Sequence, residues 1–540
     1  MQHSAHSGRA CIKAVAVDRV MCSQARRHER GEGRYPESRV DPNANLAIGY
    51  ESIFRWHVHG EVSSSPCPTR QPATRQPATC AATNPTRQPA CNQPNPQRAT
   101  AEQPSQHQLI IETMTAAEQY FIESITEKDG HRPPYRRATA PKTMDDSGQV
   151  ISREEPFAAV LMRSHAHKYC AHCFAKFDNE SPGKRCSGGC EFTYYCGRQC
   201  QKKHHGTVHK HTCKRYAAIV GQATQFYSST STTGDEFPFE DFMLARAVYI
   251  VMCARSGFSV KEHKLDGLAP VQISALCEGL ETSVKEEERL LAHAIAASFG
   301  FEQNKRPKAI TFFTSLLLKF RHNNFGIQNE LQQVIASGVF PRGAILNHSC
   351  DPNCMLTYDG PTQIITTTKP VSEGEELFHS YTDICQPTAV RQESLFNTYG
   401  FRCDCVRCQG LGQWKLVEGK LVGGNDSLSD EDTKTISLSL LMAQKISSES
   451  ADEEDDLLRE YNLLRKVLAI QTEALDRFNT ERYKTECLAL SVALILGSEE
   501  ALSHARAIVD FLAFVCNEHH PLLLLQRRTL SELEGIFGDK

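Results

Sequence analysis

The 540-residue sequence has no run of about 18 apolar residues, the length that a membrane-spanning helix requires. Its N-terminus also lacks the continuous apolar segment that is typical of a secretory signal. The formal net charge is only −4, which argues against a protein that binds nucleic acid over its whole surface. These absences predict a cytoplasmic and nuclear protein with no membrane span, in which disulfides are not expected.

Cysteine, in contrast, is abundant, and ten of the 22 cysteines fall with one histidine into two clusters that have metal-ligand spacing. Zinc binds four thiolate or imidazole ligands tetrahedrally, and a short turn can present two of them to one ion. The first cluster has eight ligands, enough for two ions, and metal binding would largely fold this segment. We therefore favour zinc over disulfides. The first cluster is Cys170, Cys173, Cys186, Cys190, Cys196, Cys200, His209 and Cys213, and the second is Cys403, Cys405 and Cys408.

The order of ligands in the first cluster resembles the MYND zinc finger, a module in which two metal sites interleave. The stretch QKKHHGTVHKHTC has no tryptophan, where the family usually has one that lines a peptide groove. Peptide partners of the finger are therefore an open expectation, and direct DNA binding is not expected. The resemblance implies one zinc on Cys170, Cys173, Cys196 and Cys200, and a second on Cys186, Cys190, His209 and Cys213.

Between the clusters, GVFPRGAILNHSCDPNC and the later GEELFHSYTD resemble the SET domain of lysine methyltransferases. Together with the finger, the chain resembles the SET-and-MYND family over roughly residues 130–408. The resemblance implies an enzyme that uses S-adenosylmethionine to methylate lysines of histone or non-histone proteins. The stretch that corresponds to the family's first cofactor motif has no glycine. A weakly active or inactive zinc protein that serves as a protein-interaction or transcriptional adaptor is therefore the alternative.

Methyl transfer to a lysine requires the reacting atoms in line and an amine that is neutral, although its free pKa is about 10.4. A narrow and dry channel favours the neutral amine. The resemblance implies that Tyr381 is the catalytic tyrosine, and that Tyr399 and Phe401 line the substrate channel. The cofactor contacts implied in the same way are Asn323, Asn347, His348, Tyr381, Phe401 and Arg137.

The second cluster supplies only three ligands, whereas a closed structural zinc site needs four. The family takes the fourth from the cysteine of NHSC, here Cys350, and Cys354 and Cys385 are the alternatives. About three zinc ions per chain are therefore expected, at four ligands each.

The fold class expected is α+β: a SET β-fold split by a MYND finger and a helical insert, followed by a cysteine-rich post-SET segment and an all-α C-terminal domain. Strands are expected near Val150 and Ala158, over 377–381, and as a hairpin of 355–358 with 363–368. A short helix is expected over 112–125. The expected domains are a disordered low-complexity region (1–128), the first SET part (129–169), the finger (170–213), the helical insert (214–310), the SET core (311–384), the post-SET segment (385–410) and an acidic linker with TPR-like helices (411–540).

Overall fold

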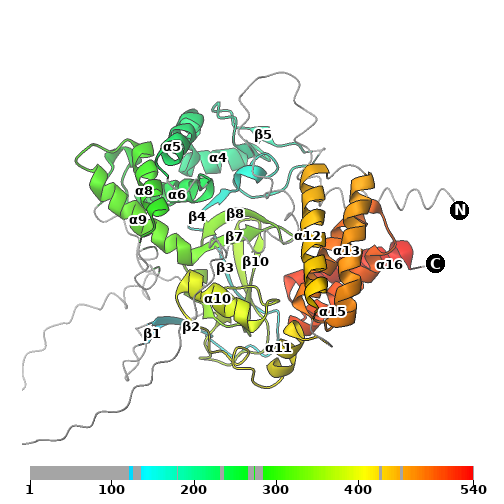
Figure 1. The fold of residues 1–540 in the computed structure, drawn as a ribbon. Helices are drawn as coiled ribbons and strands as arrows, with labels where there is room; N and C mark the ends of the chain where they lie inside the picture. Colours follow the sequence, from blue (N-terminus) through cyan, green and yellow to red (C-terminus); the bar gives the residue numbers. More distant parts are fainter. Residues whose placement is uncertain are drawn as a thin grey trace, which may run out of the picture. The chain divides into compact units, whose positions relative to one another are not determined.

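The structure of the chain is a computed structural model (Figure 1). Strand β1 (Phe121–Ile125) pairs antiparallel with β2 (Tyr135–Thr139). The helix expected over 112–125 is therefore wrong at 121–125, where FIESI supplies β-branched and aromatic residues that suit a paired strand. The remainder of that expectation, and most of the region expected to be disordered, lies outside the described residues. The structure describes residues 121–125, 135–178, 181–231, 236–265, 273, 276, 284–424, 428–450 and 454–538.

The first three-stranded sheet carries the expected hairpin at one edge and is ordered β10-β11-β3. Strands β10 (Cys354–Asp359) and β11 (Thr362–Thr367) form the hairpin, and β3 (Val150–Glu154) pairs antiparallel with β11. Gly360 in the turn has a φ of +57°, which glycine adopts without strain. A Cβ there would lie 2.7 Å from the carbonyl oxygen of Cys173, so the tip of the hairpin packs closely against the finger.

A second antiparallel sheet has β8 at its centre, between β4 and β7. All six residues of β8 are buried, as expected for a strand with covered faces. Two very short strands, β9 and β12, pair in parallel and bring NHSC beside FHSY. The strand expected over 377–381 covers only β12, because the backbone N–H of Tyr381 donates to the His348 side chain instead of a neighbouring strand. The bounds are β4 (Ala158–Leu161), β7 (Asn324–Gln328), β8 (Val334–Val339), β9 (Asn347–His348) and β12 (Phe378–His379).

Within the finger, the short strands β5 and β6 pair, and helix α4 follows them. The insert that follows contributes α5, α6 and α8, and α9 leads from it into the sheet. Phe242, Ala245 and Val248, which recur at i+3 spacing, are fully buried in α6, and their core includes Ala158 of β4 and Val339 of β8. Helix α9 crosses the expected boundary at 310. The bounds are β5 (Lys184–Arg185), β6 (Tyr194–Tyr195), α4 (Arg198–Thr207), α5 (Tyr216–Thr230), α6 (Phe239–Arg255), α8 (Glu286–Phe299) and α9 (Arg306–Asn323).

The C-terminal part is helical, and α12 to α16 contact one another in sequence order, as in a bundle of antiparallel helices (Figure 1). Helix α11 lies near the start of the range 411–540, where an acidic linker was expected to come before the helices. None of the helices that the structure describes has the length and apolar character needed to cross a membrane. The bounds are α10 (Thr388–Tyr399), α11 (Trp414–Val422), α12 (Asp430–Ser450), α13 (Glu454–Ala474), α14 (Thr480–Leu496), α15 (Ala501–Val515) and α16 (Pro521–Phe537).

Candidate active site and metal centres

The first finger site brings together Cys170, Cys173, Cys196 and Cys200, whose sulfur atoms lie within 4.8 Å of one another. The Sγ atoms of Cys173 and Cys196 are 3.7 Å apart, and those of Cys196 and Cys200 are 3.4 Å apart. Four sulfurs at about 2.3 Å from a tetrahedral zinc ion would be separated by about 3.8 Å, so this spacing suits the ion. Cys196 lies just before α4 and Cys200 within its first turn, so one helix start presents two of the ligands.

The second finger site holds Cys186, Cys190, His209 and Cys213, and all four residues are buried. His209 Nε2 lies 3.2 Å from Cys190 Sγ and 3.3 Å from Cys186 Sγ. Burial lowers the pKa of His209 to about 4, so the imidazole is neutral, the form that binds metals. A Cβ on Gly188 would lie only 2.5 Å from Cys213 Sγ, so the loop can close around this site only with glycine at that position.

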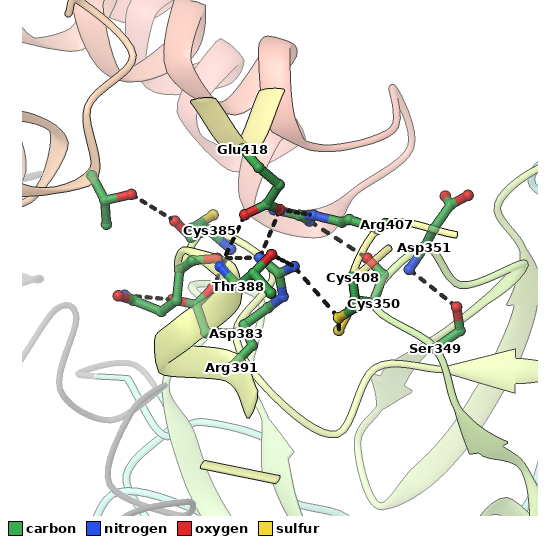
Figure 2. A network of polar contacts seen from close by, with 12 residues as sticks. Ser349, Cys350, Asp351, Asp383, Cys385, Thr388, Arg391, Arg407, Cys408 and Glu418 are labelled. Carbon is green, nitrogen blue, oxygen red and sulfur yellow. Dashed lines mark hydrogen bonds and ion pairs between the residues drawn. The ribbon is translucent and has the colours of Figure 1, made fainter. Parts of the chain in front are cut away.

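The third group joins Cys350 to Cys403, Cys405 and Cys408, residues that are far apart in the sequence. The Sγ atoms of Cys350 and Cys408 are 3.5 Å apart (Figure 2). The two alternative fourth ligands lie in other surroundings. Cys354 packs in the core of the first sheet, and Cys385 packs against the C-terminal helices.

Tyr381 lies in a group of aromatic rings that the NHSC strand, the FHSY strand and the end of α10 bring together. We call His348, His379, Tyr381, Tyr399 and Phe401 the aromatic cluster. The ring centroid of Tyr381 is 4.8 Å from that of His379, 4.9 Å from Tyr399 and 5.3 Å from His348. Phe401 lies 6.0 Å from His348 and 6.3 Å from Tyr399. Burial raises the pKa of Tyr399, which keeps its phenol neutral. Such rings present negative faces that attract a cation.

The side chain of His348 links the tyrosine to the third cysteine group. Its Nδ1 accepts a hydrogen bond from the backbone N–H of Tyr381 at 2.9 Å, and its Nε2 lies 3.1 Å from Cys350 Sγ. The Tyr381 hydroxyl donates to the carbonyl oxygen of Leu346 at 2.7 Å, so both ends of the tyrosine are fixed. The resemblance implies that Asn347 and His348 contact the cofactor through backbone and side chain, and in this structure both ring nitrogens of His348 are engaged within the protein.

The expected cofactor residue Asn347 donates through Nδ2 to the carbonyl oxygen of Arg136 at 2.8 Å and to Glu376 Oε1 at 2.7 Å. Burial raises the pKa of Glu376, while the hydrogen bond from Asn347 and the positive charge of Arg137 oppose that rise. Arg137 therefore lies close enough to act on the same carboxylate. The sequence interpretation passed over Glu376. The sequence feature that could have indicated Glu376 is the acidic pair in GEELF, which comes just before the strand that leads to Tyr381.

Asn323, the remaining predicted contact, is the last residue of α9 and is buried. Its Nδ2 donates to the carbonyl oxygen of Lys319, one turn earlier in the same helix, at 2.7 Å. A cavity of about 360 Å³ lies elsewhere, between α8 and α9, and is lined by residues that include His293, Thr311 and Leu318. It contains none of the predicted site residues.

Comparison with known proteins finds a SET-domain family model and lysine methyltransferases among the similar proteins. Residues 159–382 match the family model described as "SET domain". The chain is 24% identical over 425 residues to "Histone-lysine N-methyltransferase ASHR1" of Arabidopsis thaliana, covering 73% of this chain and 83% of that protein. It is 27% identical over 262 residues to "Histone-lysine N-methyltransferase SMYD3" of Homo sapiens, covering 48% of this chain and 56% of that protein. The match to "N-lysine methyltransferase SMYD2" of Gallus gallus is 28% identical, covering 48% and 55%.

The sheets, the aromatic cluster and the family match define a SET-domain protein. With the finger ligands that interrupt that domain and the similarity to named lysine methyltransferases, they support the resemblance to the SET and MYND family. The resemblance stated from the sequence is therefore confirmed. The matched segment spans little more than half the length of the animal relatives.

Proposed function

We propose that this protein transfers a methyl group from S-adenosylmethionine to lysine side chains of histone or non-histone proteins. The observation that carries the proposal is the fixed position of Tyr381. Its ring lies within the aromatic cluster, and its hydroxyl is held at the Leu346 carbonyl, directly before the NHSC strand. S-adenosylmethionine, when bound, supplies an electrophilic methyl group on a cationic sulfonium.

The protein's part in the reaction is to deliver a neutral amine in the correct direction. Burial among Tyr381, Tyr399 and Phe401 removes water from a lysine amine, and removing water from a cation lowers its pKa. Tyr381 is fixed by hydrogen bonds at its backbone N–H and at its hydroxyl, and this hydroxyl orients the amine. Such positioning can account for a large part of the barrier reduction in a reaction that needs in-line geometry.

Cofactor binding is proposed for the residues around the NHSC strand. Because the ring of His348 is engaged by Tyr381 and Cys350, His348 would contact the cofactor through its backbone. Asn347 donates to the Glu376 carboxylate, whose pKa burial raises and the positive charge of Arg137 lowers, and these three residues would form the polar end of the site. Although β2 has no glycine, polar groups are therefore still present at this end of the site. Asn323, Tyr381 and Phe401 complete the proposed set.

Zinc is proposed at all three four-residue groups, which gives three ions per chain. The donor chemistry fits, because each group offers only thiolates or thiolates with one neutral imidazole. The third ion would join the post-SET segment to Cys350, and Cys350 touches the imidazole that holds Tyr381. Removal of this metal should therefore disturb the active site as well as the fold.

The proposal is tested by binding and transfer together. Isothermal titration calorimetry should detect S-adenosylmethionine binding to the purified full chain, and labelled methyl groups should appear on lysines of a protein extract or purified histones. Binding without transfer to any extract would count against the enzyme. Absence of both would favour the adaptor interpretation.

A further inference from the structure

Two arginines beside the third metal group are completely buried. Arg391 in α10 and Arg407, which lies between the ligands Cys405 and Cys408, both have side chains with 0% exposure. A guanidinium stays charged in proteins, and burying that charge is unfavourable unless partners surround it. The groups that surround the two arginines therefore indicate which negative charges the arginines serve.

One carboxylate, Glu418 of α11, holds both arginines. Its Oε1 lies 2.9 Å from Arg391 Nη1 and 2.6 Å from Arg407 Nε, and its Oε2 accepts from the backbone N–H of Thr388 at 2.9 Å. The arginines lower the pKa of Glu418 and overcome the opposing effect of burial, so the carboxylate stays ionised. Figure 2 shows Glu418 on one side of the pair.

On the side away from Glu418, the two arginines face the ligands of the metal group (Figure 2). Arg407 Nη1 donates to the carbonyl oxygen of Cys350 at 3.4 Å. Arg391 Nη2 lies 3.9 Å from Cys408 Sγ, a donor–sulfur contact. The ring of Trp414 covers the guanidinium of Arg407 at 4.6 Å from its centroid, which shields the charge from water.

The charges explain this arrangement. Four thiolates around one divalent zinc ion leave an excess of two negative charges in a partly buried place. The two arginines and Glu418 together carry one positive charge, with Arg391 against the Cys408 sulfur and Arg407 against the Cys350 carbonyl. Charge and hydrogen bonds near a bound metal typically change its affinity by about 10- to 100-fold.

We propose that Arg391 and Arg407, oriented by Glu418, are positioning residues that balance the charge of the third metal site and hold Cys350 and Cys408 in place. This inference rests on the zinc content proposed above. It goes beyond the ligands themselves, and through Cys350 and His348 it reaches Tyr381.

The test compares Arg407→Met with Arg407→Lys in the full chain. The two new side chains are both long and unbranched, but only lysine keeps the positive charge. Arg402→Met is the matched control, because Arg402 lies next to Cys403 but is exposed and covers Phe396 instead. The measurement is the equilibrium distribution of zinc between the protein and a competing chelator, and the binding step that Cys403→Ser abolishes identifies the third site.

Arg407→Met should weaken zinc binding at the third site by about 10- to 100-fold. Arg407→Lys should recover most of that loss, and Arg402→Met should match the wild type. Equal losses in the lysine and methionine variants would overturn the charge argument, as would no loss in either. If Arg407→Met does not fold, the same comparison at Arg391 decides the question.

A double-mutant cycle separates this function from simple pairing with Glu418. If Arg407 acts on the metal site, Arg407→Met should lower the melting temperature less in a Cys403→Ser background than in the wild type. An equal decrease in both backgrounds would overturn the inference. Wild-type protein with no more zinc than Cys403→Ser would overturn the third site and the inference together. Absent methyl transfer with the expected metal results would count against the proposed activity alone.

Discussion

Replacing Tyr381 with phenylalanine removes one hydroxyl and keeps the ring. The ring should remain in place, because its packing against His379 and Tyr399, at 4.8 and 4.9 Å, does not involve the hydroxyl. The lost hydrogen bond leaves the Leu346 carbonyl without its donor from Tyr381, and Leu346 is fully buried. We expect a stability loss of about 1–2 kcal/mol from this carbonyl.

The effect on catalysis should be larger than the effect on stability. A preorganised hydrogen-bonding group that acts mainly in the transition state contributes about 2–4 kcal/mol, which corresponds to about 30- to 1,000-fold in rate. Both kcat and kcat/KM should fall by this factor, while the Kd for S-adenosylmethionine should hardly change. The assay is transfer of labelled methyl groups to a lysine substrate, with calorimetry for the cofactor.

Tyr358→Phe is the matched control. Tyr358 lies on β10, and its hydroxyl accepts a hydrogen bond from Gln363 Nε2 at 3.3 Å. This change should cost a similar amount of stability and leave kcat/KM within about twofold, as expected for a site outside the chemistry. Full activity of Tyr381→Phe, or an equal loss in the two variants, would refute the placement of the active-site tyrosine.

Three further predictions concern the surrounding structure. Cys403→Ser should reduce the zinc content by one ion and lower both the melting temperature and methyl transfer; unchanged zinc by elemental analysis would contradict the third site. Burial raises the pKa of Glu460 to about 7, so its contribution to stability is greatest below its unfolded pKa and is lost as pH rises through 7. Glu460→Gln should therefore stabilise the protein at pH 8 by up to about 3 kcal/mol and have little effect near pH 4. The free energy of unfolding, measured with denaturant at both pH values, would contradict this if the variant were stabilised only at pH 4. Glu154 accepts hydrogen bonds from the backbone N–H groups of Arg342 and Gly343, at the turn that leads to Leu346. Glu154→Gln should lower the free energy of unfolding by about 1–2 kcal/mol and should also lower turnover. Unchanged kinetics would show that this turn does not position the active site.

Local patterns in the sequence were enough for the elements whose formation depends on neighbouring residues. The hairpin of β10 and β11 follows from alternating residues around Asp359-Gly360, because glycine fits the turn without strain. The buried stripe of α6 follows from its i+3 spacing. The expected helix over 112–125 failed at β1, because pairing with β2 is a partner effect that local propensity does not contain.

The sequence by itself determined which cysteines and which histidine have metal-ligand spacing, and its resemblance to the SET domain indicated Tyr381 as the candidate catalytic tyrosine. Short ligand spacings and motifs carry that information, because they depend only on local chain geometry. The tertiary structure alone decided how these parts are connected. It made His348 the link between Cys350 and Tyr381, and it put Glu418 between two buried arginines beside the third metal group. Such contacts join residues that are distant in the chain, so they follow from packing of the whole domain and not from any local pattern.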